Sequence, residues 1–126
     1  MTLVDTSIWI DRFRRADTRL RHLLVEDRVL THPFVIGEIA LGVLPKASPI
    51  LGDLQRLPKV RIANDQEILH FISARKLSGL GIGLVNAHLL AAVILTPGAR
   101  LWTRDKKLIA AAERTDTAAI IVGLRL

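Results

Sequence analysis

The sequence contains no cysteine and no tyrosine, and its aromatic residues are limited to three phenylalanines and two tryptophans. Without cysteine there are no disulfide bonds, thiolate metal sites or cysteine nucleophiles, which suits a reducing compartment. So few aromatic rings argue against a protein that stacks single-stranded bases on an aromatic platform. Apolar runs are also short, and none approaches the roughly 20 residues that a membrane-spanning helix needs. We therefore expect a protein with no membrane association.

Acidic residues are fewer than basic ones, since 12 Asp and Glu oppose 18 Lys and Arg and leave a net charge of +6. Such an excess favours a polyanionic partner. Five arginines lie in one short segment: Arg12, Arg14, Arg15, Arg19 and Arg21. Because guanidinium groups grip phosphate in a bidentate manner, an RNA or DNA backbone is a candidate ligand for this face. A solvated helix surface and a docking site for an acidic protein are the alternatives.

Short apolar runs alternate with helical patterns along the whole chain, which we expect to form a single domain over residues 1–126. The chain opens on the pattern of a buried strand and not on an export leader, so we expect a cytoplasmic location. The expected strands cover residues 2–4, 28–31, 59–63, 99–103 and 118–122, and the expected helices cover 7–15, 20–26, 33–44, 49–57, 64–77, 85–95 and 105–114. This order predicts an α/β fold with a mainly parallel central sheet of about four to five strands, covered by helices on both faces.

The first acidic residue follows the first predicted strand directly, in the stretch MTLVDTSIWID. Asp5 ends that strand, and Thr6 and Ser7 are residue types that cap helices. In open parallel sheets, ligands bind outside the carboxyl ends of the strands, so Asp5 is well placed for chemistry. Its alternative role is to cap the next helix.

A second acid, Glu38, lies within an apolar helical pattern. Its neighbours three and four positions away carry neither charge nor hydrogen-bonding groups. An ionised acid in apolar surroundings costs several kcal/mol unless it is paired or bound to a cation. Either this face of the helix is exposed or Glu38 has a cation, and we favour the cation because so apolar a helix rarely has a free face.

A third acid, Asp105 in the segment LWTRD, repeats the position of Asp5 between a strand and a helix. Adjacent parallel strands would bring both acids to one edge of the sheet, although Asp105 also has the position of a cap. Three converging carboxylates repel one another unless a divalent cation neutralises them, and oxygen ligands favour Mg²⁺ or Mn²⁺ over zinc. Asn86, before the run AHLLAAVIL, has the position and type of a helix cap.

Other motifs carry less chemistry. The glycine-rich loop SGLGIG lacks the third glycine of a dinucleotide fingerprint, and no GKS or GKT follows it. The four histidines show no metal-binding spacing, so we expect them on the surface or in the core.

Four motifs together resemble the PIN-domain ribonuclease family: VDTS, the glutamate within PFVIGEIALG, NAHLLAA after GIG, and LWTRD. Within that family the chain is most similar to the VapC toxins of bacterial VapBC toxin–antitoxin modules. The resemblance implies a metal-dependent endoribonuclease in which Asp5, Glu38 and Asp105 hold Mg²⁺ or Mn²⁺. It also implies that hydroxyls of Thr6 and Thr103 line the site, that the protein forms a homodimer, and that a VapB-type antitoxin silences it.

One position departs from the family, because Asn86 stands where these proteins carry a further acid. An engineered substitution and a natural variant with weakened activity both explain it, and in either case we expect weaker metal binding and low cleavage. Asn86 therefore joins the three acids as a candidate catalytic residue.

Three basic residues lie beside Asp105, namely Arg104, Lys106 and Lys107. They either hold the RNA backbone together with Arg12, Arg14 and Arg15 or are solvated charges. Two functions follow: a nuclease, or an inactive PIN domain that binds antitoxin or RNA without cutting.

Overall fold

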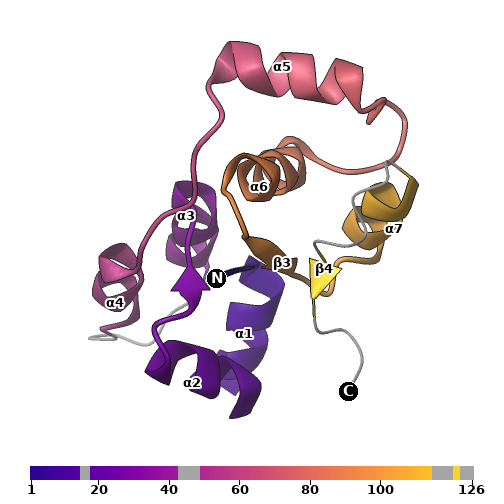
Figure 1. Ribbon diagram of the computed structural model, residues 1–126. Coiled ribbons are helices and arrows are strands. Elements are labelled where there is room, and N and C mark those ends of the chain that lie inside the picture. The colour runs from indigo at the N-terminus through magenta and orange to yellow at the C-terminus, as the bar shows by residue number, and fades with distance from the viewer. Residues whose placement is uncertain (15–17, 43–48, 115–120, 123–126) are drawn as a thin grey trace.

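The computed structural model describes residues 1–14, 18–42, 49–114 and 121–122 (Figure 1). Within these residues, strands and helices follow the predicted order, except that no strand forms at residues 59–63. The strands are β1 (Thr2–Val4), β2 (Val29–Leu30), β3 (Arg100–Trp102) and β4 (Ile121–Val122). The helices are α1 (Thr6–Arg14), α2 (Thr18–Val25), α3 (Pro33–Leu41), α4 (Ile50–Arg56), α5 (Asp65–Ala74), α6 (Leu84–Leu95) and α7 (Lys106–Arg114).

The strands form one parallel sheet in the order β2-β1-β3-β4. The central pair is in register from Thr2 opposite Arg100 to Val4 opposite Trp102. The chain leaves β1 toward one edge of the sheet and later leaves β3 toward the other. The connections therefore diverge between β1 and β3, which is the place where open α/β sheets bind their ligands. Asp5 and Asp105 follow these two strands.

Helices cover both faces of the sheet, as the sequence predicts. Figure 1 shows α1 and α2 on one side and α6 on the other, with α5 lying outside α6. Helix α6 packs between β3 and α5, and its residues from Ala87 to Val93 are buried. This position on both sides explains why its sequence is apolar around the whole helix. None of the described helices combines the length and apolarity needed to cross a membrane.

Two predicted elements differ from expectation, since one strand is missing and one helix is shorter. Residues 59–63 do not form a strand, because only Lys59 bridges to Thr31. The Val60 N–H still donates to the Thr31 carbonyl at 3.1 Å, but the ladder ends there because Pro33, the next residue on that edge, lacks an N–H and begins α3, and the Arg61 N–H on the other side donates to the Thr96 hydroxyl at 2.9 Å. The helix predicted to reach residue 44 ends at Leu41, where Gly42 has an extended backbone, and residues 43–48 lie outside the described part of the chain.

The start of α5 is fixed by a capping box that the sequence predicts. The Asn64 side chain accepts from the Glu67 backbone at 2.8 Å, and the Glu67 carboxylate accepts from the Asn64 backbone at 2.9 Å. We expect Asn64→Ala to lower the free energy of unfolding by about 1 kcal/mol, because it leaves an N–H of the first turn without its acceptor. Urea unfolding measures this, with Asn64→Asp as a control that keeps the acceptor. Equal losses in both variants would contradict the cap as the cause.

Candidate active site

Asp5 is fixed at the end of β1 by three hydrogen bonds. The backbone N–H of Thr6 donates to Oδ1 at 2.8 Å. The hydroxyls of Ser7 and Thr103 both donate to Oδ2 at 2.8 Å. Because its side chain is only slightly exposed, these donors replace the water that an ionised carboxylate would otherwise bind. Asp5 therefore presents a fixed carboxylate at the point where β1 gives way to α1.

Asp105 caps α7 and also faces the same region. Its Oδ1 accepts from the backbone N–H groups of Lys107 and Leu108, at 2.9 and 3.1 Å. Its own N–H donates to the Thr103 hydroxyl at 3.0 Å, so one threonine links the two acids. Thr103 is fully buried and lies behind the carboxylates instead of lining the pocket. The predicted role as a cap is confirmed for Asp105, and it leaves Oδ2 turned away from the helix.

Glu38 reaches this region from α3. The Thr6 hydroxyl donates to its Oε1 at 2.8 Å. Contrary to the expectation from its apolar sequence, α3 has a free face, because Glu38 is exposed, Phe34 is 39% exposed and Leu41 is 90% exposed. Only Val35 and Ile39 of this helix are fully buried, so its apolar sequence reflects one packed side and one open side. Exposure alone thus accounts for an acid in α3, and a role for Glu38 rests on its position beside Thr6.

Asn86 does not cap α6, contrary to the sequence-based expectation. The helix begins earlier, at Leu84, with Gly83 as its cap residue, so Asn86 lies inside the first turn. From there its amide Nδ2 donates to Asp105 Oδ2 at 3.0 Å. This hydrogen bond connects α6 to the turn before α7 and gives the outward oxygen of Asp105 a neutral partner.

The three acids line one open pocket of about 630 Å³ at the carboxyl end of the sheet. It is lined by Asp5, Thr6, Ser7, Ile10, Glu38, Gly83, Leu84, Val85, Asn86, Arg104 and Asp105. Arg104 is the one basic residue in this lining, as far as the chain is described. The pocket is therefore acidic, although the chain as a whole is basic.

The donor set of the pocket fits a hard divalent cation, because its polar lining offers oxygen atoms and neither thiolate nor imidazole. In the described part of the chain, however, no three His, Asp or Glu side chains are grouped so that they could hold a metal ion as they stand. Each acid keeps at least one oxygen with an unused lone pair, because Oδ1 of Asp5, Oδ2 of Asp105 and Oε1 of Glu38 each accept a single hydrogen bond, so the bonds orient the acids without exhausting them. Holding an ion would require the acids to close in from the pocket walls.

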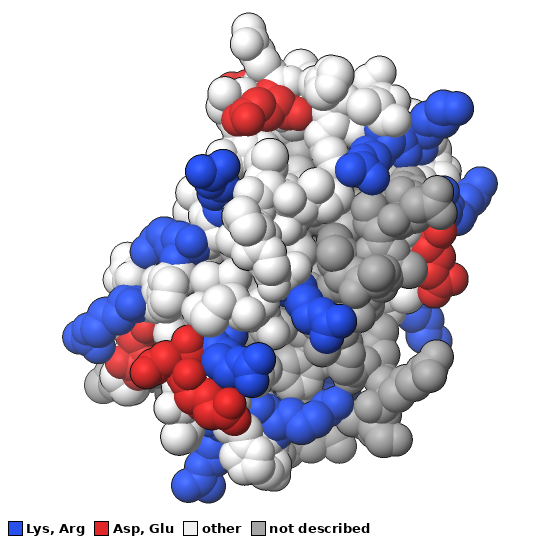
Figure 2. Space-filling view, in the orientation of Figure 1, with Lys and Arg blue, Asp and Glu red and all other residues white. Residues whose placement is uncertain are grey.

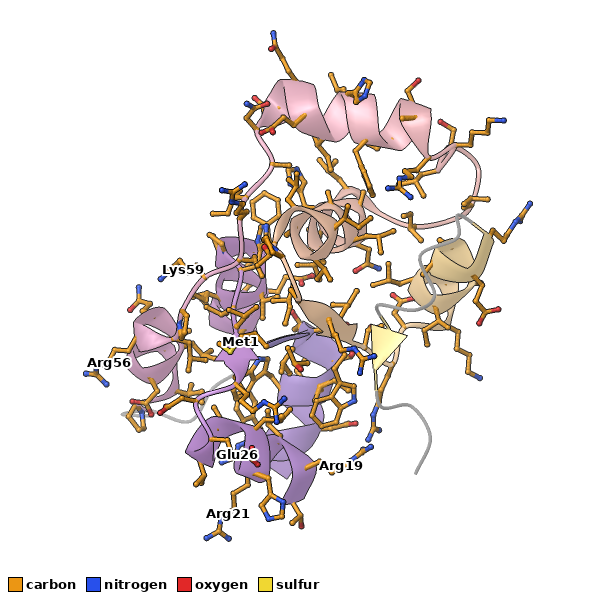
Figure 3. All side chains as sticks on the ribbon, in the orientation of Figure 1. Met1, Arg19, Arg21, Glu26, Arg56 and Lys59 are labelled. Carbon is orange, nitrogen blue, oxygen red and sulfur yellow. The ribbon has the colours of Figure 1, made fainter. Side chains whose placement is uncertain are left out.

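The described arginines of α1 and α2 that were predicted to contact phosphate lie away from this pocket. Arg12 lines a smaller pocket beside Trp9, and Arg19 stacks over the Trp102 ring at 4.9 Å. Arg21 points outward from α2 (Figure 3). The side chain of Arg14 and all of Arg15 fall outside the described residues. On the face drawn in Figure 2, Lys and Arg are spread over several elements instead of forming one patch.

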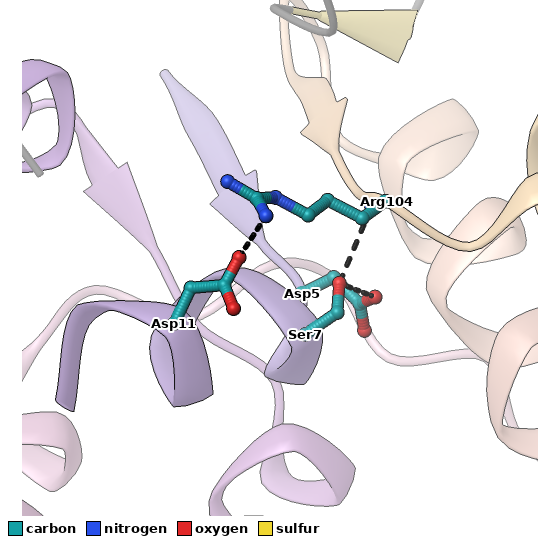
Figure 4. Close-up of polar contacts among 4 residues, drawn as sticks. All are labelled: Asp5, Ser7, Asp11 and Arg104. Atoms are coloured by element: carbon teal, nitrogen blue, oxygen red, sulfur yellow. Dashed lines mark hydrogen bonds and ion pairs between the residues drawn. The ribbon is translucent and has the colours of Figure 1, made fainter. Parts of the chain in front are cut away.

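Lys106 is exposed at the first position of α7, while Arg104 lines the pocket. Two residues of the site were missed by sequence reasoning, namely Ser7 and Asp11. The Ser7 hydroxyl accepts from the Arg104 N–H at 3.2 Å, and Asp11 forms an ion pair with the Arg104 guanidinium (Figure 4). Ser7 lies two residues after Asp5, close enough in sequence for its hydroxyl to donate to that carboxylate, and this spacing was a usable signal. No local pattern connects Asp11 with residue 104.

Two histidines are buried in the core, as expected, and neither lines the acidic pocket. His32 caps α3, because its Nδ1 accepts from the Phe34 N–H at 2.9 Å. His88 of α6 contacts the same phenylalanine, with ring centroids 4.8 Å apart. Burial, with a smaller contribution from His88, lowers the pKa of His32 from 6.5 to about 4. Burial also lowers the pKa of His88, an effect that Asp65 partly opposes. Both rings are therefore neutral at pH 7.

Comparison with known proteins agrees with this geometry. The model of the PIN domain family matches residues 2–114. Ribonuclease VapC32 from two strains of Mycobacterium tuberculosis, CDC 1551 / Oshkosh and ATCC 25618 / H37Rv, is 45% identical over 118 residues, which cover 94% of this chain and 95% of that protein. The predicted family resemblance is confirmed. With its parallel sheet, its acidic pocket at the β1 and β3 ends and this identity over nearly the full length, the chain belongs to the PIN-domain family and is of the VapC type.

Proposed function

We propose that this chain is an Mg²⁺- or Mn²⁺-dependent endoribonuclease, the toxin of a type II toxin–antitoxin module, with cleavage weakened by Asn86. The observation that carries this proposal is the convergence of Asp5, Glu38 and Asp105, from three separate elements, on one open pocket. That pocket belongs to a chain of the PIN family whose relatives are named ribonucleases.

The proposed roles follow from the contacts of each side chain. Asp5, Glu38 and Asp105 would hold the divalent cation, which when bound polarises a phosphoryl oxygen and lowers the pKa of bound water. Thr6 and Ser7 orient the carboxylates of Glu38 and Asp5 through 2.8 Å hydrogen bonds. Arg104 supplies the positive charge of the lining and is the candidate contact for an RNA phosphate, with Lys106 beside it.

The neutral Asn86 is the reason to expect weak activity. It offers one carbonyl oxygen where an aspartate offers a charged pair, and at neutral pH it cannot accept a proton from water. Its amide instead donates to Asp105, and so gives that acid a partner other than a cation. The second function, a PIN domain that binds RNA or an antitoxin without cutting, would follow if this hydrogen bond kept Asp105 from holding a cation.

The name of the relatives implies partners as well. We propose a VapB-type antitoxin whose tail enters the acidic pocket, an RNA substrate, a homodimeric toxin and action in the cytoplasm. An acidic pocket with one basic residue suits a cationic antitoxin side chain as well as it suits a metal ion.

Calorimetric titration of Mn²⁺ tests the proposal directly. We expect Asp5→Asn to weaken Mn²⁺ binding at least about tenfold, a loss that even outer-shell partners of a metal cause. The low RNA cleavage of the unchanged chain should fall to the level seen with EDTA. Asp53→Asn is the matched control, because Asp53 pairs with Arg56 on the exposed side of α4, away from the acidic pocket. Mn²⁺ binding unaffected by Asp5→Asn would contradict the proposed metal ligand.

The non-cutting alternative makes a different prediction. It expects undiminished binding of antitoxin or RNA, with no cleavage by the chain as it is or by its Asn86→Asp variant. Cleavage restored by Asn86→Asp would instead show that the remaining machinery is complete.

A further inference from the structure

The ion pair between Arg104 and Asp11 lies at the rim of the acidic pocket. The guanidinium Nη1 of Arg104 contacts Asp11 Oδ2 across the face of α1 (Figure 4). The Asp11 side chain is 23% exposed, and its Oδ2 is shielded from water, so in the described structure the Arg104 guanidinium is the partner of that oxygen. The charge on that oxygen is therefore offset by Arg104 and not by water, although the Arg104 side chain itself is 41% exposed.

The backbone of Arg104 is held by the same helix. Its N–H donates to the Ser7 hydroxyl, and that hydroxyl donates to Asp5 Oδ2. Ser7 and Asp11 are four residues apart on α1, so they lie on one side of the helix. One side of α1 thus fixes Arg104 at both ends, at the backbone through Ser7 and at the guanidinium through Asp11.

The position of this guanidinium matters because of its surroundings. Arg104 is in the lining of a pocket that also holds the carboxylates of Asp5, Glu38 and Asp105. Without Asp11, the long and flexible Arg104 side chain would be attracted to the carboxylates of that pocket, where the nearby negative potential is strongest. Folded onto the acids, it would compete with a cation for the same oxygen atoms and would no longer be available to a phosphate.

We propose that Asp11 is a positioning residue, which holds the Arg104 guanidinium at the rim and so leaves the acids open to a divalent cation and Arg104 open to RNA. This inference rests on the proposed function, and it assigns to Asp11 a role separate from metal ligation. Asp11 acts through Arg104 alone, so removing Asp11 should have no effect once Arg104 is absent.

A double-mutant cycle on the full chain tests the inference, with Mn²⁺ alone as the first probe. We expect Asp11→Asn to weaken Mn²⁺ binding about fivefold in calorimetry. Arg104→Gln should strengthen it or leave it unchanged. The double variant should match Arg104→Gln, because the competing cation is then gone.

Binding of a fluorescent single-stranded RNA in EDTA is the second probe, and it is independent of cleavage and of metal. Asp11→Asn raises the net charge by one, so unspecific attraction alone predicts tighter RNA binding. Positioning predicts weaker binding, by about fivefold as well. Asp53→Asn makes the same charge change at the exposed Asp53–Arg56 pair and should leave RNA binding equal or slightly tighter. Thermal unfolding of each variant identifies any that do not fold, and Asp11→Ser is then the replacement.

Each outcome bears on a different claim. If Asp11→Asn binds Mn²⁺ and RNA as the unchanged chain does, or if the effects of the two substitutions add, the inference is wrong and the proposed function stands. If the unchanged chain binds neither Mn²⁺ nor RNA, both are wrong. Coupled losses that vanish without Arg104 support the positioning role.

Discussion

The substitution Asn86→Asp is expected to increase RNA cleavage in Mn²⁺ by about 100-fold, because metal stabilisation of the transition state is worth several kcal/mol and each 1.4 kcal/mol is tenfold. In the unchanged chain, the Asn86 amide donates to Asp105 Oδ2 at 3.0 Å. An aspartate there puts two carboxylate oxygens at about that contact, and their repulsion is relieved by a bound cation. Mn²⁺ affinity and cleavage should therefore rise together.

The same repulsion should lower stability when no metal is present. We expect Asn86→Asp to unfold at a lower temperature than the unchanged chain in EDTA. Added Mn²⁺ should raise the unfolding temperature of the variant more than that of the unchanged chain. Asn86→Ala is the matched control, because it removes the hydrogen bond without adding charge and should gain neither affinity nor cleavage. If Asn86→Asp binds Mn²⁺ no better than Asn86→Ala, the part of the acidic pocket beside Asn86 and Asp105 is not a metal site.

Acidification from pH 6.5 to pH 4 should cost the fold about 3 kcal/mol through His32. Its pKa is about 4 in the folded protein and 6.5 when unfolded, so the unfolded chain takes up the proton first. The stabilisation due to the neutral ring is fully present above pH 6.5, falls as the pH drops toward 4 and is lost below it. The structural cause is local, since a proton on Nδ1 would occupy the lone pair that accepts from Phe34 N–H. Burial of His88 acts in the same direction.

Urea unfolding at several pH values measures this loss. His32→Asn keeps an acceptor for the start of α3 but does not titrate, so its stability should vary less between pH 6.5 and 4. His22→Asn removes an exposed histidine of α2 and should leave the pH dependence unchanged. Equal pH dependence in His32→Asn and the unchanged chain would exclude His32 as the source.

The sequence predicts those features of the fold that depend on neighbouring residues. The capping box at Asn64, the cap at Asp105 and the acid after β1 are each set within a few positions, and all three are present. Convergence of Asp5 and Asp105 follows from the parallel order of β1 and β3, because the carboxyl ends of such strands meet at one edge.

The features that sequence reasoning missed depend on distant partners. Asn86 has the residue type of a cap, but α6 begins at Leu84, so Asn86 lies inside the first turn and its amide donates to Asp105. Glu38 was interpreted from the apolar residues of its own helix, whereas its exposure depends on which side of α3 the rest of the molecule covers. The strand predicted at residues 59–63 does not form for the same reason. It has no neighbouring strand along its length, only one bridge to Thr31 and one hydrogen bond to the Thr96 side chain.

The pairing of β1 with β3 joins the start of the chain to residues 100–102, and the bond from Thr103 to Asp5 spans 98 positions. During synthesis on a ribosome, β1 is therefore made before six helices and one further strand, β2, and only then is its central neighbour β3 made, a delay typical of parallel sheets with distant pairings. The acidic pocket therefore cannot assemble until residues 100–105 have been made, because Asp5 is held by Thr103 and shares the pocket lining with Asp105.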